Sequence, residues 1–148
     1  MGIHCLVFGY GSLIHPDSAN RTLRRPEPPH DFQPATLRGY QRAWRLHVRR
    51  HFADAPPDRQ TDCVVLDIVP RPGMTMNGVL IPVTTDELAR LDQREAHYDR
   101  VDVTGAIEPA PPHTVITYAG KDEHTHPPAD AVIAETYLRV VIDRKSVV

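Results

Sequence analysis

The chain has 148 residues, of which 41% are hydrophobic and 24% are charged, a balance typical of one globular domain and poorly suited to a disordered chain, a coiled coil or a membrane channel. Its 17 Lys and Arg against 19 Asp and Glu give a net charge of −2, so nucleic-acid binding would need a local basic patch. We therefore expect a single domain over residues 1–148.

The two cysteines and the first apolar stretch indicate where the protein works. Cys5 and Cys63 each lie in an apolar run, and a chain of this length needs no disulfide, so we expect two reduced core residues. The run from Ile3 to Ile14 is interrupted by glycines and falls short of the roughly 20 apolar residues that span a bilayer. We expect no signal peptide and no membrane anchor, and hence a cytoplasmic location.

Two strands are predicted in the first third of the chain. The run Ile3–Phe8 is rich in β-branched and aromatic residues and ends at Gly9, which is typical of a buried strand that leads into a tight turn. Further on, Trp44, Leu46 and Val48 alternate with basic residues. This period of two predicts a strand with one buried face and one wet face.

Two more strands and a helix follow. The apolar runs Cys63–Val69 and Met76–Val83 are separated by two prolines and a glycine, which predicts two strands joined by a turn and able to pair with each other. Thr84 then stands three residues before Glu87, the spacing of a capping box. A helix is expected to start there and to carry Glu95 near its end.

The last third of the chain completes the predicted fold. The segments Val101–Val103 and Thr114–Tyr118 favour two strands, and a C-terminal helix is expected from about Ala129 to Ile142. Most connections are too short for helical crossovers, so the sheet is expected to be antiparallel or mixed. The predicted class is α+β, with a small mixed or antiparallel β-barrel and flanking helices.

The first candidate site follows the first strand, where the segment from Phe8 to Leu13 reads Phe-Gly-Tyr-Gly-Ser-Leu. Glycines at this place let backbone N–H groups approach an anion closely. The alternative is a plain turn with Tyr10 packed in the core. The spacing matches neither a Walker loop nor a dinucleotide fingerprint.

The second candidate is Glu95, at the exit of the predicted helix and close in sequence to Arg94, Tyr98 and Arg100. Burial of this carboxylate would raise its pKa and suit it to proton transfer, whereas a neighbouring arginine would lower that pKa. The alternative is a solvated ion pair with Arg94 or Arg100.

These segments, taken together, resemble the γ-glutamylcyclotransferase superfamily, which includes ChaC-like and AIG2-like proteins. Five landmarks appear in order over nearly the whole chain: Phe8–Ile14, Leu37–Tyr40, Asn77–Leu80, Leu91-Asp92 with Glu95, Tyr98 and Arg100, and Thr136–Leu138. The resemblance implies a small β-barrel whose cavity binds a small γ-glutamyl compound and releases 5-oxoproline without a metal or organic cofactor.

The resemblance also implies roles for individual residues. Glu95 would be the general acid and base, and Tyr10 would shape the pocket. The backbone of Gly11, Ser12 and Leu13, together with the Ser12 hydroxyl, would hold the substrate's α-carboxylate. Tyr137 would be a further substrate contact. The leaving group stays open: an amino acid, cysteinylglycine, an amine or a lysine side chain.

Three other interpretations remain. His124 and His126 are close in sequence but lack a third ligand at a recognisable spacing, so no metal is expected. The segment Arg38–Arg50, which carries five arginines and two aromatic residues, is the alternative of an RNA-binding module, unless Trp44 faces the core and the arginines face solvent. The third is a non-catalytic metabolite-binding protein of the same fold.

Overall fold

The computed structural model describes residues 2–11, 22–24, 32–135 and 137–139. Its main feature is one six-stranded sheet in the order β4-β6-β1-β3-β2-β5. The strands are β1 (Cys5–Gly9), β2 (Gln33–Arg50), β3 (Thr61–Val83), β4 (Tyr98–Asp102), β5 (Ile107–Glu108) and β6 (Val115–Gly120). The helices with defined bounds are α2 (Thr85–Arg94) and the single turns η2 (Thr104–Ala106) and η3 (Asp122–His124). None of the helices in these ranges has the length and apolar character needed to cross a membrane.

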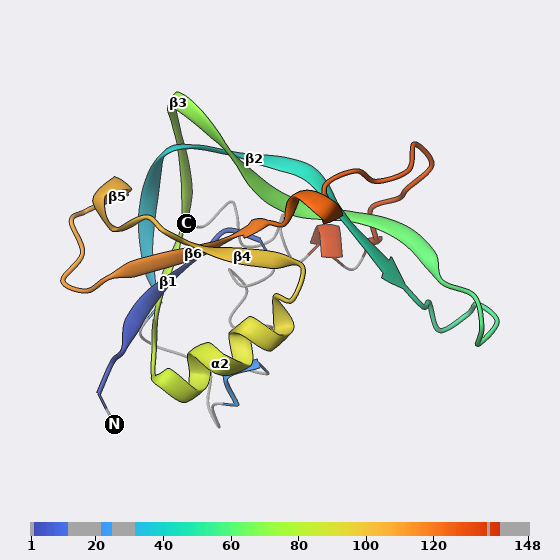
Figure 1. Ribbon diagram of the computed structural model, residues 1–148, viewed down its shortest axis with the longest axis horizontal. Coiled ribbons are helices and arrows are strands. Elements are labelled where there is room, and N and C mark those ends of the chain that lie inside the picture. Colours follow the sequence, from blue (N-terminus) through green and yellow to red (C-terminus); the bar gives the residue numbers. More distant parts are fainter. Residues whose placement is uncertain (1, 12–21, 25–31, 136, 140–148) are drawn as a thin grey trace.

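The sheet is mixed and curled. β1 pairs parallel with β6 and antiparallel with β3, while the other neighbours are antiparallel. The two edge strands, β4 and β5, are joined by residues 103–106 alone, so the edges of the sheet must come near each other. The result is a half-barrel with α2 against its outer side (Figure 1), which confirms the α+β class and the predicted mixed, barrel-like sheet.

β1 is buried on both faces, as expected for its unbroken apolar run. Leu6 and Phe8 join the cluster inside the curl, whereas Cys5 and Val7 join the cluster beneath α2. Cys5 and Cys63 are both buried and unbonded. The predicted strand is therefore confirmed, and Tyr10, which follows its end at Gly9, is part of the inner cluster.

The predicted turn between two strands in residues 63–83 is wrong. These residues belong to the single strand β3, which pairs with β2 from Thr61 to Leu80 and not with itself. Residues 71–74 lie between the paired positions Thr75 and Pro70 and face one residue of β2, Gly39. Gly39 and Gly73 have φ angles of 82° and 85°, the left-handed region that favours glycine. The proline and glycine residues thus bend the β2–β3 pair, visible at the top of Figure 1, instead of reversing the chain.

The expected burial of Trp44 is also wrong. Trp44 pairs with Leu66 and Leu46 pairs with Val65, so Arg45 is an extra residue in β2. Because successive residues of β3 face opposite sides of the sheet, this bulge puts Trp44 and Leu46 on opposite faces. Leu46 is fully buried, whereas Trp44 is 40% exposed.

The helix that precedes Glu95 begins as predicted. Thr84 is the N-cap of α2, and its side chain forms the reciprocal capping box with Glu87. Leu88 and Leu91 are buried against the outer cluster of the sheet. Glu95 is the C-cap residue, and its backbone N–H donates to the Leu91 carbonyl at 2.8 Å. The helix end therefore fixes the backbone of Glu95.

Removing the cap should destabilise the protein measurably. In Thr84→Ala the Glu87 amide loses its acceptor, which lies at 3.2 Å, and the free energy of unfolding is expected to fall by about 1 kcal/mol. Urea denaturation measures the change. Thr85→Ala, at the next and exposed position, is the control, and an equal loss in both variants would contradict a capping role.

The predicted C-terminal helix starts later than expected. Residues 129–130 form a turn, and helical geometry begins at Glu135. In between, Val132 bonds to the backbone of β3: its N–H donates to Asp62 and its carbonyl accepts from Val64. These bonds hold the segment extended, so the helix forms only after them. The predicted end at Ile142 lies outside the described residues.

Candidate active site

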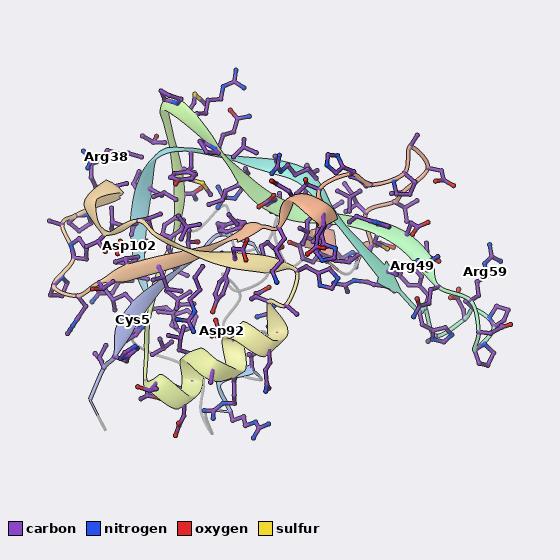
Figure 2. The ribbon with its side chains drawn as sticks, viewed as in Figure 1. Cys5, Arg38, Arg49, Arg59, Asp92 and Asp102 are labelled. Atoms are coloured by element: carbon purple, nitrogen blue, oxygen red, sulfur yellow. The ribbon has the colours of Figure 1, made fainter. Side chains whose placement is uncertain are left out.

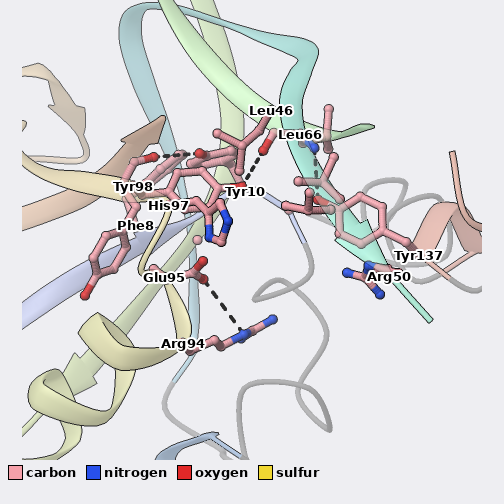
Figure 3. A pocket seen from close by; sticks show the side chains of 15 residues that line it. Phe8, Tyr10, Leu46, Arg50, Leu66, Arg94, Glu95, His97, Tyr98 and Tyr137 are labelled. Atoms are coloured by element: carbon pink, nitrogen blue, oxygen red, sulfur yellow. Dashed lines mark hydrogen bonds and ion pairs between the residues drawn. The ribbon is translucent and has the colours of Figure 1, made fainter. Parts of the chain in front are cut away.

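A cavity of about 230 Å³ opens inside the curl of the sheet (Figure 3). Its walls come from β1, β2, β3 and β6, from the segment after α2, and from Tyr137. Four of the residues predicted to form the site line it together: Tyr10, Gly11, Glu95 and Tyr137. The two other predicted residues, Ser12 and Leu13, lie outside the described residues.

Glu95 is the carboxylate of this cavity. Its side chain is 14% exposed, and burial raises its pKa, while the Arg94 guanidinium lowers it. Arg94 Nε lies 3.9 Å from Glu95 Oε1, at the edge of ion-pair distance. The carboxylate is therefore held largely out of water, with a cation on one side (Figure 3).

Arg100, the second arginine close to Glu95 in the sequence, pairs with a different carboxylate. Arg100 forms a two-pronged ion pair with Asp92, with Nε donating to Oδ1 at 2.9 Å and Nη2 bonding to Oδ2. Asp92 also accepts the hydroxyl proton of Tyr118 at 2.7 Å. The Arg100 bond, followed by the Tyr118 bond, holds the pKa of Asp92 below its usual range. Arg100 is thus paired with a carboxylate other than Glu95.

Three tyrosines besides Tyr137 line the cavity: Tyr10, Tyr98 and Tyr118. Tyr10 donates to the backbone carbonyl of Tyr118 at 2.6 Å, and Tyr98 donates to the carbonyl of Leu66 at 2.7 Å. Burial raises the pKa of Tyr10, Tyr98 and Tyr118 well above the ordinary value. These hydroxyls therefore stay protonated, and each donates its proton in a hydrogen bond to another group of the protein.

Tyr137 is bonded differently. Its hydroxyl oxygen accepts the N–H of Leu66 at 3.1 Å, and burial raises its pKa to about 12. Among the described residues nothing accepts the hydroxyl proton of Tyr137, which leaves that proton available to a ligand. A Cβ on Gly11 would lie 3.0 Å from this oxygen, so the glycine leaves the space that the hydroxyl needs.

Sequence reasoning missed several residues of the cavity wall. His97 lines it, and burial followed by the nearby His124 lowers the pKa of His97. Their ring centroids are 4.4 Å apart. Arg50 also lines the cavity, with its guanidinium carbon 5.9 Å from the ring centroid of Tyr137. The only available signal for His97 was its position two residues after Glu95. Arg50 was considered in the sequence only as part of the basic segment Arg38–Arg50.

Three of the five arginines of the segment Arg38–Arg50 form ion pairs within the chain. Arg38 pairs with Glu108 at 3.2 Å, Arg45 with Asp67 at 2.8 Å and Arg49 with Asp62 at 3.3 Å. Figure 2 shows Arg38 and Arg49 far apart along the long strand β2. No single basic face is assembled from these three side chains.

The histidines give no metal cluster in the part of the chain that the structure describes. Within those residues no three His, Cys, Asp or Glu side chains come together as a possible metal site. His124 ends the turn η3 and contacts Glu123 at 3.8 Å, whereas His126 is exposed.

Comparison with known proteins gives a consistent relationship. Residues 7–137 match the family described as gamma-glutamyl cyclotransferase, AIG2-like. Among solved structures, the Arabidopsis thaliana protein At5g39720.1 is 32% identical, with 83% of this chain and 72% of that chain covered and a TM-score of 0.57. No curated protein matches the chain by sequence.

Two more distant structures share the fold. One described as a gamma-glutamyl cyclotransferase is 17% identical, covers 96% of this chain and 78% of its own, and has a TM-score of 0.67. A yeast gamma-glutamyl cyclotransferase specific to glutathione is 18% identical, with 78% of this chain and 68% of that chain covered and a TM-score of 0.53.

Proposed function

Because the chain belongs to the gamma-glutamyl cyclotransferase, AIG2-like family, we propose that it cyclises a γ-glutamyl amide to 5-oxoproline and releases the amine or amino acid. The family supports an enzyme that acts on a small γ-glutamyl compound. The observation that carries the proposal is Glu95, a buried carboxylate with a raised pKa in the wall of the cavity.

The reaction needs little more than positioning and proton transfer. The substrate's own α-amine attacks its γ-carbonyl, which forms the N–C bond of a five-membered ring, and the C–N bond to the leaving group breaks. Because both reacting groups belong to one molecule, a bound conformation that brings them together gains a large effective concentration. The two protons that the α-ammonium loses are the two that the leaving amine carries away as an ammonium, so no water is consumed.

Glu95 is the group in the cavity that suits this proton transfer. As a carboxylate it accepts a proton from the α-ammonium, and as the acid it returns a proton to the departing nitrogen. Burial brings its pKa closer to neutrality, which improves both half-reactions, since the efficient pKa of a general acid and base lies near the working pH. Arg94, whose Nε lies 3.9 Å from Glu95 Oε1, opposes this rise in the pKa.

The rest of the cavity supports substrate binding. The amide of Gly11, continued by Ser12 and Leu13, is the proposed cradle of the α-carboxylate. Tyr10 forms a fixed wall because its hydroxyl is bonded to the carbonyl of Tyr118. Tyr137, whose hydroxyl proton has no acceptor among the described residues, is the proposed donor to a substrate oxygen.

A substrate panel tests the function. The purified protein is incubated with γ-glutamyl amino acids, γ-glutamyl amines and glutathione, and 5-oxoproline is followed by mass spectrometry. We expect production from at least one class, and the preferred class identifies the leaving group. A protein that binds these compounds without forming 5-oxoproline would instead be a metabolite-binding protein of the same fold.

Removing the Tyr137 hydroxyl should weaken catalysis. Tyr137→Phe keeps the ring but loses the donor, so kcat/KM for the preferred substrate is expected to fall about tenfold, the effect of one hydrogen bond in a buried site. Steady-state kinetics on 5-oxoproline formation measure it. Tyr40→Phe, on β2 and outside the cavity wall, is the matched control. Equal activity of Tyr137→Phe and wild type would refute the assignment.

A further inference from the structure

Arg42 forms three hydrogen bonds beside the Tyr10–Gly11 peptide. It lies on β2, and its Nε donates to the backbone carbonyl of Tyr10 at 3.0 Å. Its Nη1 donates to Asn77 Oδ1 at 3.0 Å, and its Nη2 donates to the Asn77 carbonyl at 2.5 Å. One guanidinium thus links the residue before Gly11 to strand β3.

The charge of Arg42 has no carboxylate partner in the part of the chain that the structure describes. Its three bonds go to two backbone carbonyls and an amide oxygen. Its side chain is half-buried, and burial lowers its pKa. A partly desolvated cation that only neutral groups contact is costly unless an anion approaches. The peptide that Arg42 contacts belongs to the cavity, because Tyr10 and Gly11 both line it.

Because the peptide bond is planar, the Arg42 contact with the Tyr10 carbonyl also fixes the direction of the Gly11 N–H. In a trans peptide the C=O of one residue and the N–H of the next point in opposite directions. Arg42 holds the Tyr10 carbonyl on its own side, and Arg42 is absent from the cavity wall while Gly11 is part of it. The Gly11 N–H is therefore turned away from Arg42. Among the described residues it donates to no acceptor.

We propose that Arg42 is a positioning residue, which fixes the Tyr10–Gly11 peptide so that the Gly11 amide meets the α-carboxylate of the substrate, with the guanidinium charge directly behind it. The inference rests on the proposed function and adds to it a residue that does not touch the substrate. Its consequence is selectivity: Arg42 should favour a ligand with an α-carboxylate over the same ligand with an α-carboxamide.

The test uses equilibrium binding of two probes, 5-oxoproline and its carboxamide, to the full chain by calorimetry. The variants are Arg42→Gln, Arg42→Lys and the control Arg38→Gln, which lies on the same strand and pairs with Glu108 at 3.2 Å. In Arg42→Gln we expect 5-oxoproline to bind roughly 10- to 100-fold more weakly, the loss for one hydrogen bond to a charged group. Binding of the carboxamide should change little.

Arg42→Lys separates charge from geometry. A lysine keeps the positive charge but lacks the planar fork that bonds Tyr10 and Asn77 at once, so an intermediate loss for 5-oxoproline is expected. This variant also carries the test if Arg42→Gln fails to fold. Wild-type binding to both probes should be retained in Arg38→Gln.

Equal weakening of both probes in the Arg42 variants, or no weakening of either, would overturn the inference while 5-oxoproline formation by wild type still supported the proposed function. Conversely, a wild-type protein that forms no 5-oxoproline from any panel compound overturns the proposed function. A merely structural role of Arg42 would lower the active fraction without changing the preference for the carboxylate, so the ratio of the two binding constants is the decisive readout.

Discussion

Replacing Glu95 by glutamine is expected to lower kcat/KM for the preferred γ-glutamyl substrate at least a hundredfold, the order expected for the loss of a general base. Glutamine has nearly the same shape but accepts no proton from the α-ammonium and returns none to the leaving nitrogen. The fold should be unaffected, because the Glu95 contact that ends α2 is made by its backbone N–H. Rates of 5-oxoproline formation measure the effect, and thermal unfolding checks the fold.

The same residue should set the acid limb of the pH profile. Glu95 acts as a base only when ionised, and burial raises its pKa. Activity is therefore expected to be lost as the pH falls through a value above the ordinary range of a glutamate, and kcat/KM reports this value for the free enzyme. In Arg94→Gln the nearby positive charge is gone, so the limb should move to higher pH.

Two outcomes would contradict this assignment of Glu95. One is a Glu95→Gln variant that retains more than a tenth of the wild-type rate, and the other is an acid limb that stays in place in Arg94→Gln. Glu123→Gln is the matched control, because Glu123 is exposed on η3 and its nearest ion-pair contact is His124 at 3.8 Å. Its kinetics should equal those of wild type.

The features that sequence predicted well depend on residues close together in the chain. The capping box needs only Thr84 and Glu87, and the burial of Leu88 and Leu91 follows from helical spacing. The apolar run Ile3–Phe8 predicts a buried strand, and the observed strand β1 (Cys5–Gly9) is covered on both faces. In each case the residues that carry the sequence pattern lie within one or two helical turns or within a single strand.

The features that it missed depend on the partner strand. The bulge at Arg45 exists because two residues of β2 oppose one step of β3, and nothing in the local alternation reveals it. Likewise, Pro70, Pro72 and Gly73 favour a turn locally, but continued pairing with β2 makes them a bend in one long strand. Pairing partners override local turn preference.

The candidate site divides in the same way. The resemblance selected Tyr10, Gly11, Glu95 and Tyr137, which span most of the chain, and the structure brings these four into one cavity. The contacts of Arg42 could not be predicted from the sequence. Two of its acceptors are backbone carbonyls, which every residue type carries. In the sequence, an arginine on a strand of alternating apolar and polar residues is interpreted as part of the solvent-exposed face. This interpretation is the same whether or not its side chain is hydrogen-bonded within the protein.

The largest loss of stability from a single substitution is expected at Asp67. This carboxylate is fully buried, and its Oδ1 accepts the backbone N–H of Ile68 and of Gly120, both at 2.7 Å. Its Oδ2 accepts Nε of Arg45 at 2.8 Å. It thereby joins the end of β6 to β3 across the curl of the sheet, next to the wall of the cavity.

Asp67→Ala removes both acceptor oxygens, and with them three hydrogen bonds, and leaves two backbone N–H groups without a partner. The free energy of unfolding is expected to fall by about 3 kcal/mol, and the melting temperature by roughly 6–12 °C for a chain of this size. Asp67→Asn keeps one acceptor oxygen for the two N–H groups, so about half of that loss is expected. Urea denaturation and thermal unfolding measure both.

The control is another carboxylate of β3 that also pairs with an arginine. Asp62 contacts Arg49 at 3.3 Å and His47 at 2.8 Å, with its side chain 33% exposed. Because water can replace these partners, Asp62→Ala should cost far less stability than Asp67→Ala. If the two alanine variants lost equal stability, the ion pairs alone would account for the effect. A larger loss at Asp67, halved by asparagine, would assign it to the buried backbone amides that the carboxylate satisfies.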